Sequence, residues 1–351
     1  MASLFSNEIP LHNISGGRGH EKPPEVTPFP FPKEQNFATS EETVSSPMWN
    51  YMQARIKKDL PFAKVCGLRR FGIRNLWEQF KLQKALAAAR NNDQNPNTQL
   101  LFHASPHPSR ITGTGYGENG NGFDPRCGNG GTYGTGAYFA EHAFYPVEIH
   151  PKIQNSDGTY HILVAEVIVG QEKDYGNNLA RDLTRPPNMS TTGCLYDSVS
   201  GTENGIAVRR GMTDEIGRQI VVFGVDRSYP HYLLTIKIEL PFQLDVRSML
   251  IFRNGIFDAT IRKRDKYYFI EDSNGNHLQV SDNNGSTGFI NTNYGEWERW
   301  TLKTRGVKLF FLSGRQNDCH GNTLGFNPNG EHRAVNKNLL RHEEFTVRLA
   351  E

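Results

Sequence analysis

The chain has 351 residues, which is long enough for two domains or for one large one. Its formal net charge of +2 gives no electrostatic case for nucleic acid or a membrane as the main partner. No apolar run reaches the length of about 18 residues that a membrane-spanning helix needs. The 34 glycines and 19 prolines favour turns and short strands over long helices.

The cysteines are scattered, and no two of them form a Cys-x-x-Cys pair. We therefore expect neither a disulfide framework nor a metal site. The first residues lack the basic-then-apolar pattern of a secretion signal. The prediction is an intracellular protein of the cytoplasm or nucleus.

Residues 1–44 are rich in Pro, Gly, Glu and Ser, a composition typical of a disordered tail. Phe29 and Phe31 are its candidates for docking on the folded body. Helical signals follow over residues 45–98. Ser45 and Ser46 precede Pro47, as at a helix start.

A second predicted helix has Asn75 as a possible cap and ends near Asn91. Its apolar stripe comprises Leu76, Trp77, Phe80, Lys84 and Leu86. Between the two helices, "VCGLRRFGI" (65–73) resembles an edge strand.

From about residue 99 to 238 the pattern changes to short apolar strands separated by long glycine-rich or polar loops. This predicts an α+β or mainly β domain, bounded at 45–240, whose site is built from loops. Residues 239–248 are a candidate linker.

Residues 249–351 predict an all-β module with a weak internal repeat. "EWERWTL", ending at Leu302, and "RHEEFTV", ending at Val347, match in character. Each follows a "G-N-x-L" element, at Gly275 and at Gly321. Repeated hairpins of this kind indicate a β-trefoil-like array, of which two leaves are visible. We expect the tryptophans of "WERW" in its core.

Several candidate residues have a plain structural interpretation when taken singly. The glycine-rich stretch 113–122 fits neither common phosphate-binding spacing and is predicted to be a flexible loop. His103 ends an apolar strand, and Tyr138 lies in "GAYFA"; alone, each would be structural. Asp214 and Glu215 are expected in a solvated loop.

Taken together, the strand "LFH" (101–103), then "GFDPR" (122–126), then "YGTGAYFA" (133–140) resemble the poly(ADP-ribose) polymerase (PARP) catalytic domain. The likeness continues on both sides in the same order, over about residues 50–238. The further matching segments are 67–84, "RPPN…LYDSV" (185–199) and 219–238. The resemblance implies a split β-sandwich of the ADP-ribosyltransferase type, with NAD as substrate.

It also implies roles for particular residues. His103 would hydrogen-bond the adenosine ribose, and Tyr138 would line the nicotinamide pocket. The backbone of Ala104 would bind the nicotinamide amide, and Tyr145 would supply a stacking ring. Gln219 would orient the nicotinamide ribose, at the position where polymerising members have a glutamate.

An amide carries no charge and cannot act as a base, so chain elongation is not expected. Pro146 stands where the family has a nicotinamide-binding serine, and Ala104 stands where it has a glycine. The resemblance thus implies a mono-ADP-ribosyltransferase acting on a macromolecular, protein acceptor. An inactive PARP-like protein that acts as a scaffold, or binds a ligand through its C-terminal module, stays open as the alternative. The C-terminal part weakly resembles fascin-like trefoils, which implies actin, glycan or protein as its ligand.

Overall fold

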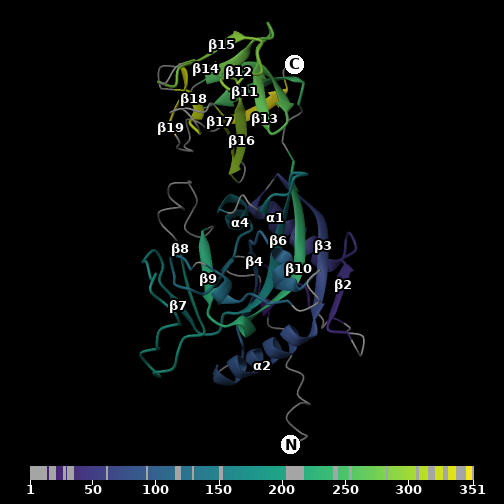
Figure 1. The fold of residues 1–351 in the computed structure, drawn as a ribbon, viewed down its shortest axis with the longest axis vertical. Coiled ribbons are helices and arrows are strands. Elements are labelled where there is room, and N and C mark those ends of the chain that lie inside the picture. Colours follow the sequence, from purple (N-terminus) through teal and green to yellow (C-terminus); the bar gives the residue numbers. More distant parts are fainter. Residues whose placement is uncertain are drawn as a thin grey trace, which may run out of the picture. The chain divides into compact units, whose positions relative to one another are not determined.

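A computed structural model describes residues 14–15, 21–26, 29, 35–60, 62–91, 94–114, 120–128, 130–149, 153–202, 217–239, 244–252, 255–281, 284–305, 308–314, 321–326, 331–336 and 345–349. The chain divides into two compact units (Figure 1). The first is formed mainly by residues up to Ile238, and the second by Glu239–Glu351.

The first unit is built on a ten-stranded sheet with the order β2-β3-β10-β6-β4-β5-β9-β8-β7, and β1 pairs with β4. The long strands are neighbours, because β10 pairs antiparallel with both β3 and β6. The strands are β1 (Ile14–Ser15), β2 (Phe37–Glu41), β3 (Ala63–Ile73), β4 (Thr98–His103), β5 (Ala137–Ala140), β6 (Thr159–Ile168), β7 (Glu172–Asp174), β8 (Ser198–Thr202), β9 (Arg218–Val222) and β10 (Ser228–Ile238).

Few helices accompany this sheet. They are α1 (Pro47–Asp59), α2 (Arg74–Arg90), α3 (Pro108–Thr112) and α4 (Phe144–Ile149), with short 3-10 turns at Pro125–Cys127 and Val225–Arg227. This agrees with the α+β prediction and is consistent with a split β-sandwich of the ADP-ribosyltransferase type. Among the residues that the structure describes, no helix is both long and apolar enough to cross a membrane.

Helix starts follow the local chemistry at α1 and depart from the prediction at α2. At α1, the Ser46 hydroxyl accepts a hydrogen bond from the backbone N–H of Trp49 at 3.1 Å, as a capping serine does. Helix α2 begins at Arg74 instead, and Ile73 occupies its cap position without a side-chain bond. The predicted stripe of α2 is buried except for Leu86, which is 47% exposed.

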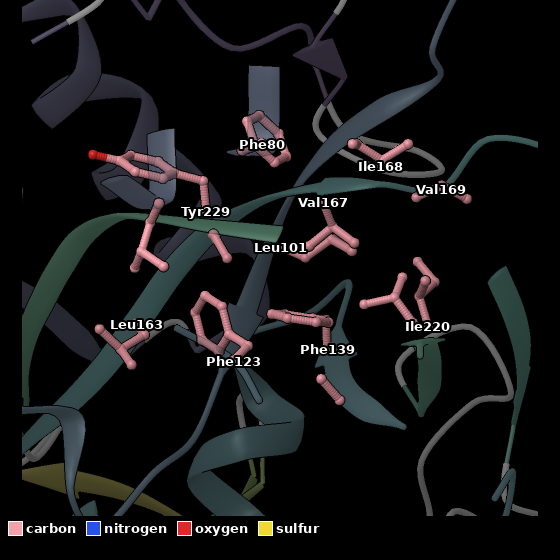
Figure 2. Packing of buried hydrophobic residues seen from close by; sticks show 14 of the residues in the cluster. Phe80, Leu101, Phe123, Phe139, Leu163, Val167, Ile168, Val169, Ile220 and Tyr229 are labelled. Carbon is pink, nitrogen blue, oxygen red and sulfur yellow. The ribbon is translucent and has the colours of Figure 1, made fainter. Parts of the chain in front are cut away.

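A hydrophobic cluster fills the space between α2 and the sheet. Figure 2 shows Phe123 and Phe139 pointing toward one another, with ring centres 4.9 Å apart. The Trp77 ring packs edge-on against Tyr229 at 5.0 Å, which fixes α2 on β10. Other members include Phe80, Leu101, Leu163, Val167, Ile168, Val169 and Ile220. Apolar packing between α2 and the sheet therefore holds the strands that carry the candidate site.

Part of the segment predicted as a disordered tail is structured. Phe37–Glu41 form β2 and pair antiparallel with β3. Val26 is buried, and the Phe29 ring lies so close to Gly72 that a Cβ there would come within 2.5 Å of it. Phe29 thus docks on the body at Gly72, where the absence of a side chain leaves room for its ring. Phe31 lies outside the described residues.

The second unit is all-β, as predicted. Its strands are β11 (Arg247–Phe252), β12 (Gly255–Arg264), β13 (Tyr267–Glu271), β14 (His277–Val280), β15 (Thr287–Asn291), β16 (Trp300–Arg305), β17 (Lys308–Ser313), β18 (Thr323–Phe326), β19 (His332–Asn336) and β20 (Phe345–Leu349). Six of them pair in a closed ring, β11-β12-β13-β16-β17-β20 and back to β11. The hairpins β14-β15 and β18-β19 branch from β13 and β17.

The two tryptophans of "WERW" differ. Trp300 is fully buried and donates its indole N–H to the carbonyl of Leu278 at 2.9 Å. Trp297 is 46% exposed, so the expectation of a core position is wrong for it. Trp300 is the first residue of β16, whereas Trp297 lies in the bend before that strand, so only Trp300 is placed by the strand.

Candidate active site

A cavity of about 560 Å³ opens at the middle of the first unit's sheet. That volume lies within the usual range for small-molecule sites. Its walls come from the end of β4 and the segment after it, from residues 121–140, and from the start of α4 and of β9. All the site residues expected from the sequence line it: His103, Ala104, Tyr138, Tyr145 and Gln219, together with Pro146.

Strand β5 brings these residues together, because it lies between β4 and β9 in the sheet. Ala140 of β5 is opposite Phe102 on one side and opposite Gln219 on the other. Residues directly opposite each other, and residues two apart along a strand, share a face. Tyr138, Ala140 and Gln219 therefore share a face with Phe102. His103, the next residue of β4, alternates to the other side and reaches β5 through the backbone carbonyl of Tyr138.

The His103 ring is fixed in orientation. Its Nδ1–H donates a hydrogen bond to the backbone carbonyl of Tyr138 at 2.7 Å. The ring also packs against Phe123 and Phe139, with centres 5.0 and 5.5 Å away. A carbonyl oxygen only accepts, so Nδ1 carries the proton. In the neutral imidazole, Nε2 is then an acceptor, which suits a ribose hydroxyl.

The Tyr138 ring is held at its far end. Its hydroxyl donates to the carbonyl of Gly134 at 2.8 Å and accepts from the backbone N–H of Tyr133 at 2.9 Å. A Cβ on Gly131 would approach the Tyr138 hydroxyl to 2.8 Å, so this close approach requires glycine. The result is a rigid aromatic face in the cavity wall.

Among the described residues, Gln219 presents a polar group with no protein partner. The residue is 5% exposed, and its side-chain Nε2 has no hydrogen-bond acceptor among the described residues. A buried donor left unpaired costs about 1–3 kcal/mol. Because Gln219 lines the cavity, a ligand bound there can supply the missing acceptor. Among the features of the site, this donor indicates most directly that a ligand binds there.

An arginine next to Gln219 carries a buried charge network that sequence reasoning missed. Arg218 donates from Nε to the carboxylate of Glu141 at 3.2 Å and from Nη1 to the hydroxyl of Ser200 at 3.0 Å. It also pairs with Glu172. Arg218 and Glu141 are both almost fully buried, so the pair links the end of β5 to the start of β9.

Helix α1 clamps the same region with two buried side chains, which the sequence did not reveal either. Arg55 donates to the carbonyls of Leu100 and Glu141, each at 2.6 Å. Asp59, one turn later, accepts from the backbone N–H of Ala143 at 2.7 Å. Burial lowers the pKa of Arg55 from its ordinary value. The clamp holds β4 and the segment that leads from β5 into α4.

Tyr145 and Pro146 sit in the first turn of α4. Tyr145 is buried at 8% exposure and lines the cavity. Its backbone N–H donates to the carbonyl of His142 at 3.2 Å. Pro146 contributes an apolar surface to the wall where a serine hydroxyl was the family expectation.

Three further predictions from the sequence concern the glycine-rich stretch, Asp214 with Glu215, and metal binding. Gly113 adopts φ 82° and ends α3, and residues 121–122 line the cavity, so part of the glycine-rich stretch is structural. The expected loop residues Asp214 and Glu215 lie outside the described residues. Within the part that is described, no group of three or more His, Cys, Asp or Glu side chains is placed to hold a metal ion.

Comparison with known proteins supplies the family context. No protein-family profile matches the chain. Human protein mono-ADP-ribosyltransferase PARP14 is 25% identical over 212 residues, 58% of this chain. Mouse PARP12 is 26% identical over 53% of the chain, and mouse PARP10 is 29% identical over 47%. The chain resembles the PARP-type mono-ADP-ribosyltransferases. The resemblance expected from the sequence is thereby confirmed, although the trefoil part has no such support.

The chain spans only part of these PARP relatives. The matched region covers 10% of PARP14, 23% of PARP12 and 15% of PARP10. The PARP-type likeness supports an NAD-dependent ADP-ribosyltransferase family as the setting of the cavity. It leaves the activity of this chain, and the role of each residue, to be argued from the site.

Proposed function

We propose that the chain is a mono-ADP-ribosyltransferase that moves ADP-ribose from NAD to a protein acceptor and releases nicotinamide. The observation that carries the proposal is the buried Nε2 of Gln219, which has no partner among the described residues, in a cavity that His103 and Tyr138 also line. The cavity has the size, the aromatic walls and the few directed polar groups typical of a site for a nucleotide-sized ligand.

The reaction needs rigid positioning more than acid–base chemistry. The bond between C1′ of the nicotinamide ribose and the nicotinamide ring nitrogen breaks, and its electron pair leaves with the ring. Nicotinamide departs neutral because that nitrogen carried the positive charge. The acceptor's nucleophile bonds to C1′ and gives its proton to solvent. Holding the dinucleotide and the acceptor in line lowers the barrier by removing their relative freedom.

Each residue has a role in this scheme. His103, whose Nδ1–H is engaged by Tyr138, would offer Nε2 to a hydroxyl of the adenosine ribose. Tyr138 and Tyr145 would pack against the nicotinamide ring. The backbone of Ala104 would hydrogen-bond the amide group of the nicotinamide. Gln219 would donate its free N–H to an oxygen of the nicotinamide ribose and accept from a hydroxyl there.

The amide of Gln219 favours a single transfer over chain growth. Elongation requires a ribose hydroxyl to be activated as a nucleophile, and a neutral amide cannot take its proton. An amide also gives less electrostatic stabilisation of the oxocarbenium-like transition state than a carboxylate would. We therefore assign slow, single additions to this chain.

The alternative is an inactive PARP-like protein that acts as a scaffold. Pro146, Ala104 and Gln219 favour it, because each departs from the residue expected for an active site.

In both cases the proposed domain division is a catalytic-type domain at 45–240 and a binding module at 249–351. The ring of six strands with two branching hairpins supports a trefoil-like module in which the hairpin β11-β12 replaces a third leaf. Actin, a glycan or a protein stays its predicted ligand.

Incubation with labelled NAD tests the proposal. Wild type, His103→Ala and Tyr138→Ala would be compared, with label followed on the chain itself and on added protein. We expect a discrete shift in wild type that both variants lose. A ladder of long products would contradict the role of Gln219. No label on any protein, with NAD binding retained, would favour the scaffold.

A further inference from the structure

The outer face of the second unit carries a cluster of cations stacked on tyrosines. Tyr268 and Trp300 pair across β13 and β16 and are buried, so their neighbours Tyr267 and Arg299 point to the opposite, outer face. Arg264 is opposite Tyr267 in the β12-β13 hairpin and shares this face. We call Arg264, Lys266, Tyr267, Tyr294 and Arg299 the basic–aromatic face.

The stacking within this face is close. The Arg264 guanidinium carbon lies 3.2 Å from the centre of the Tyr294 ring. The Arg299 guanidinium carbon and the Lys266 ammonium lie 5.0 and 5.3 Å from the centre of the Tyr267 ring. These contacts are within the range of cation–π interactions. Arg264 and Lys266 are exposed, and Tyr267, Tyr294 and Arg299 are partly exposed, so this face is accessible from solvent.

These cations lack the partners that other arginines of the unit have. Arg247 pairs with Asp258 at 2.5 Å, and Arg262 pairs with Glu271 and Asp245. Within the described part of the chain, no carboxylate pairs with Arg264, Lys266 or Arg299. After the paired Arg262, residues 263–266 read "KRDK", three cations and one carboxylate. A nearly neutral chain thus gathers uncompensated positive charge at one place.

We infer that the basic–aromatic face binds single-stranded nucleic acid. Unpaired cations would contact the phosphates, and flat side chains that alternate with them would stack on bases. An acidic peptide would use the cations but would gain little from the tyrosine and guanidinium planes. A duplex would hide its bases from those planes. The half-exposed Trp297, three residues after Tyr294, adds an aromatic surface to the same segment.

The test uses the full chain and fluorescence anisotropy with a short labelled oligouridylate at low salt. Losing one stacked base costs about 1–3 kcal/mol, so Tyr267→Ala should weaken binding roughly 5- to 150-fold. The double variant Arg264→Gln/Arg299→Gln, which keeps side-chain bulk, should weaken it and should also lower the slope of affinity against salt. Arg247→Gln is the matched control, because that arginine is already paired with Asp258, and it should bind like wild type.

A labelled oligoglutamate of similar length separates the two classes of partner. Binding of the oligouridylate that Tyr267→Ala and the double arginine variant both reduce, while Arg247→Gln does not, supports the inference. Tighter binding of oligoglutamate than of oligouridylate would overturn it and assign the face to an acidic protein. Absence of oligouridylate binding at low salt, or equal loss in Arg247→Gln, would overturn it as well. Circular dichroism of each variant shows whether the unit has kept its fold.

Discussion

The Nδ1–H of His103 donates to the main-chain carbonyl of Tyr138 across 2.7 Å, so two residues that line the cavity are hydrogen-bonded to each other. They lie on adjacent strands, β4 and β5, and are 35 positions apart in the chain. The bond fixes the tautomer of the imidazole through the backbone of the residue that supplies the aromatic wall. Displacing either residue should therefore disturb both.

Gly131→Ala tests how tightly Tyr138 is held. The new Cβ would lie 2.8 Å from the Tyr138 hydroxyl and Cζ, which is too close for unstrained packing. We expect the ring to shift, with a loss of about 1–3 kcal/mol in unfolding free energy. Gly128→Ala is the control, because a Cβ there meets only the Pro125 carbonyl at 3.6 Å. Urea unfolding of the two variants measures the difference; equal stability would contradict the packing described.

Gln219→Leu should stabilise the fold while abolishing transfer. The substitution removes a buried Nε2 that has no partner in the described structure, which relieves a cost of about 1–3 kcal/mol. The same change removes the group that would bind the nicotinamide ribose. Thermal unfolding and nicotinamide release would be measured together. A destabilised Gln219→Leu would show that the amide is paired within the protein.

Gln219→Glu probes the same position with a carboxylate. Burial raises the pKa of a carboxyl group, so its charge should appear only as the pH rises through that raised value. We expect faster nicotinamide release than in wild type, with an acidic limb in the pH profile that wild type lacks. A pH profile identical to that of wild type would contradict a place for residue 219 beside the reacting ribose.

Replacing the buried Lys84 should lower the free energy of unfolding more than replacing an exposed lysine of the same helix. Its ammonium lies 2.7 Å from Glu166, and both side chains are almost completely buried. Lys84→Met would leave the Glu166 charge without its cation, at a cost of about 3–5 kcal/mol. Lys81→Met on the same helix is the control, because Lys81 and Glu78 are exposed at 46% and 59% and such pairs contribute about 0–1 kcal/mol. Urea midpoints that coincide would refute this assignment.

His231 should make stability fall in mild acid. Burial, with the nearby Arg70 and Lys84 charges, lowers its pKa below the ordinary 6.5, although Glu166 acts in the opposite direction. The unfolded chain therefore takes up a proton on this side chain near pH 6.5 while the folded chain does not. Stability is full above pH 6.5 and declines as the pH falls toward the lowered pKa. His231→Gln should flatten this decline in urea titrations between about pH 5 and 7; an unchanged decline would contradict it.

Much of the site could be predicted because its residues occur in short local patterns. "LFH" and "YGTGAYFA" carry strand signals, and their order matched a known family, so His103, Tyr138 and Gln219 were placed in one site. The clamp of Arg55 and Asp59 could not be predicted in this way. Its bonds reach residues 45 and 84 positions away, and neither side chain differs in sequence from an exposed helical charge.

The second unit shows what composition leaves open. The net charge of +2 is a sum over the chain, so it does not tell where charges lie or that Arg264 and Arg299 have no carboxylate partner among the described residues. Trp297 and Trp300 were treated alike because they are close in sequence, whereas Trp297 lies in the bend before β16 and is 46% exposed, and Trp300 begins β16 and is buried. The type of each residue could be read from the sequence, but the direction in which its side chain points could not be known without the fold.

Calorimetric titration of the full chain with NAD tests the central claim most directly. We predict binding to one site that His103→Ala and Tyr138→Ala each weaken by about tenfold, the worth of one or two ligand contacts. Arg247→Gln, in the other unit, should bind as wild type does. Absence of NAD binding in wild type, or binding that survives both substitutions unchanged, would contradict the assignment of this cavity to NAD.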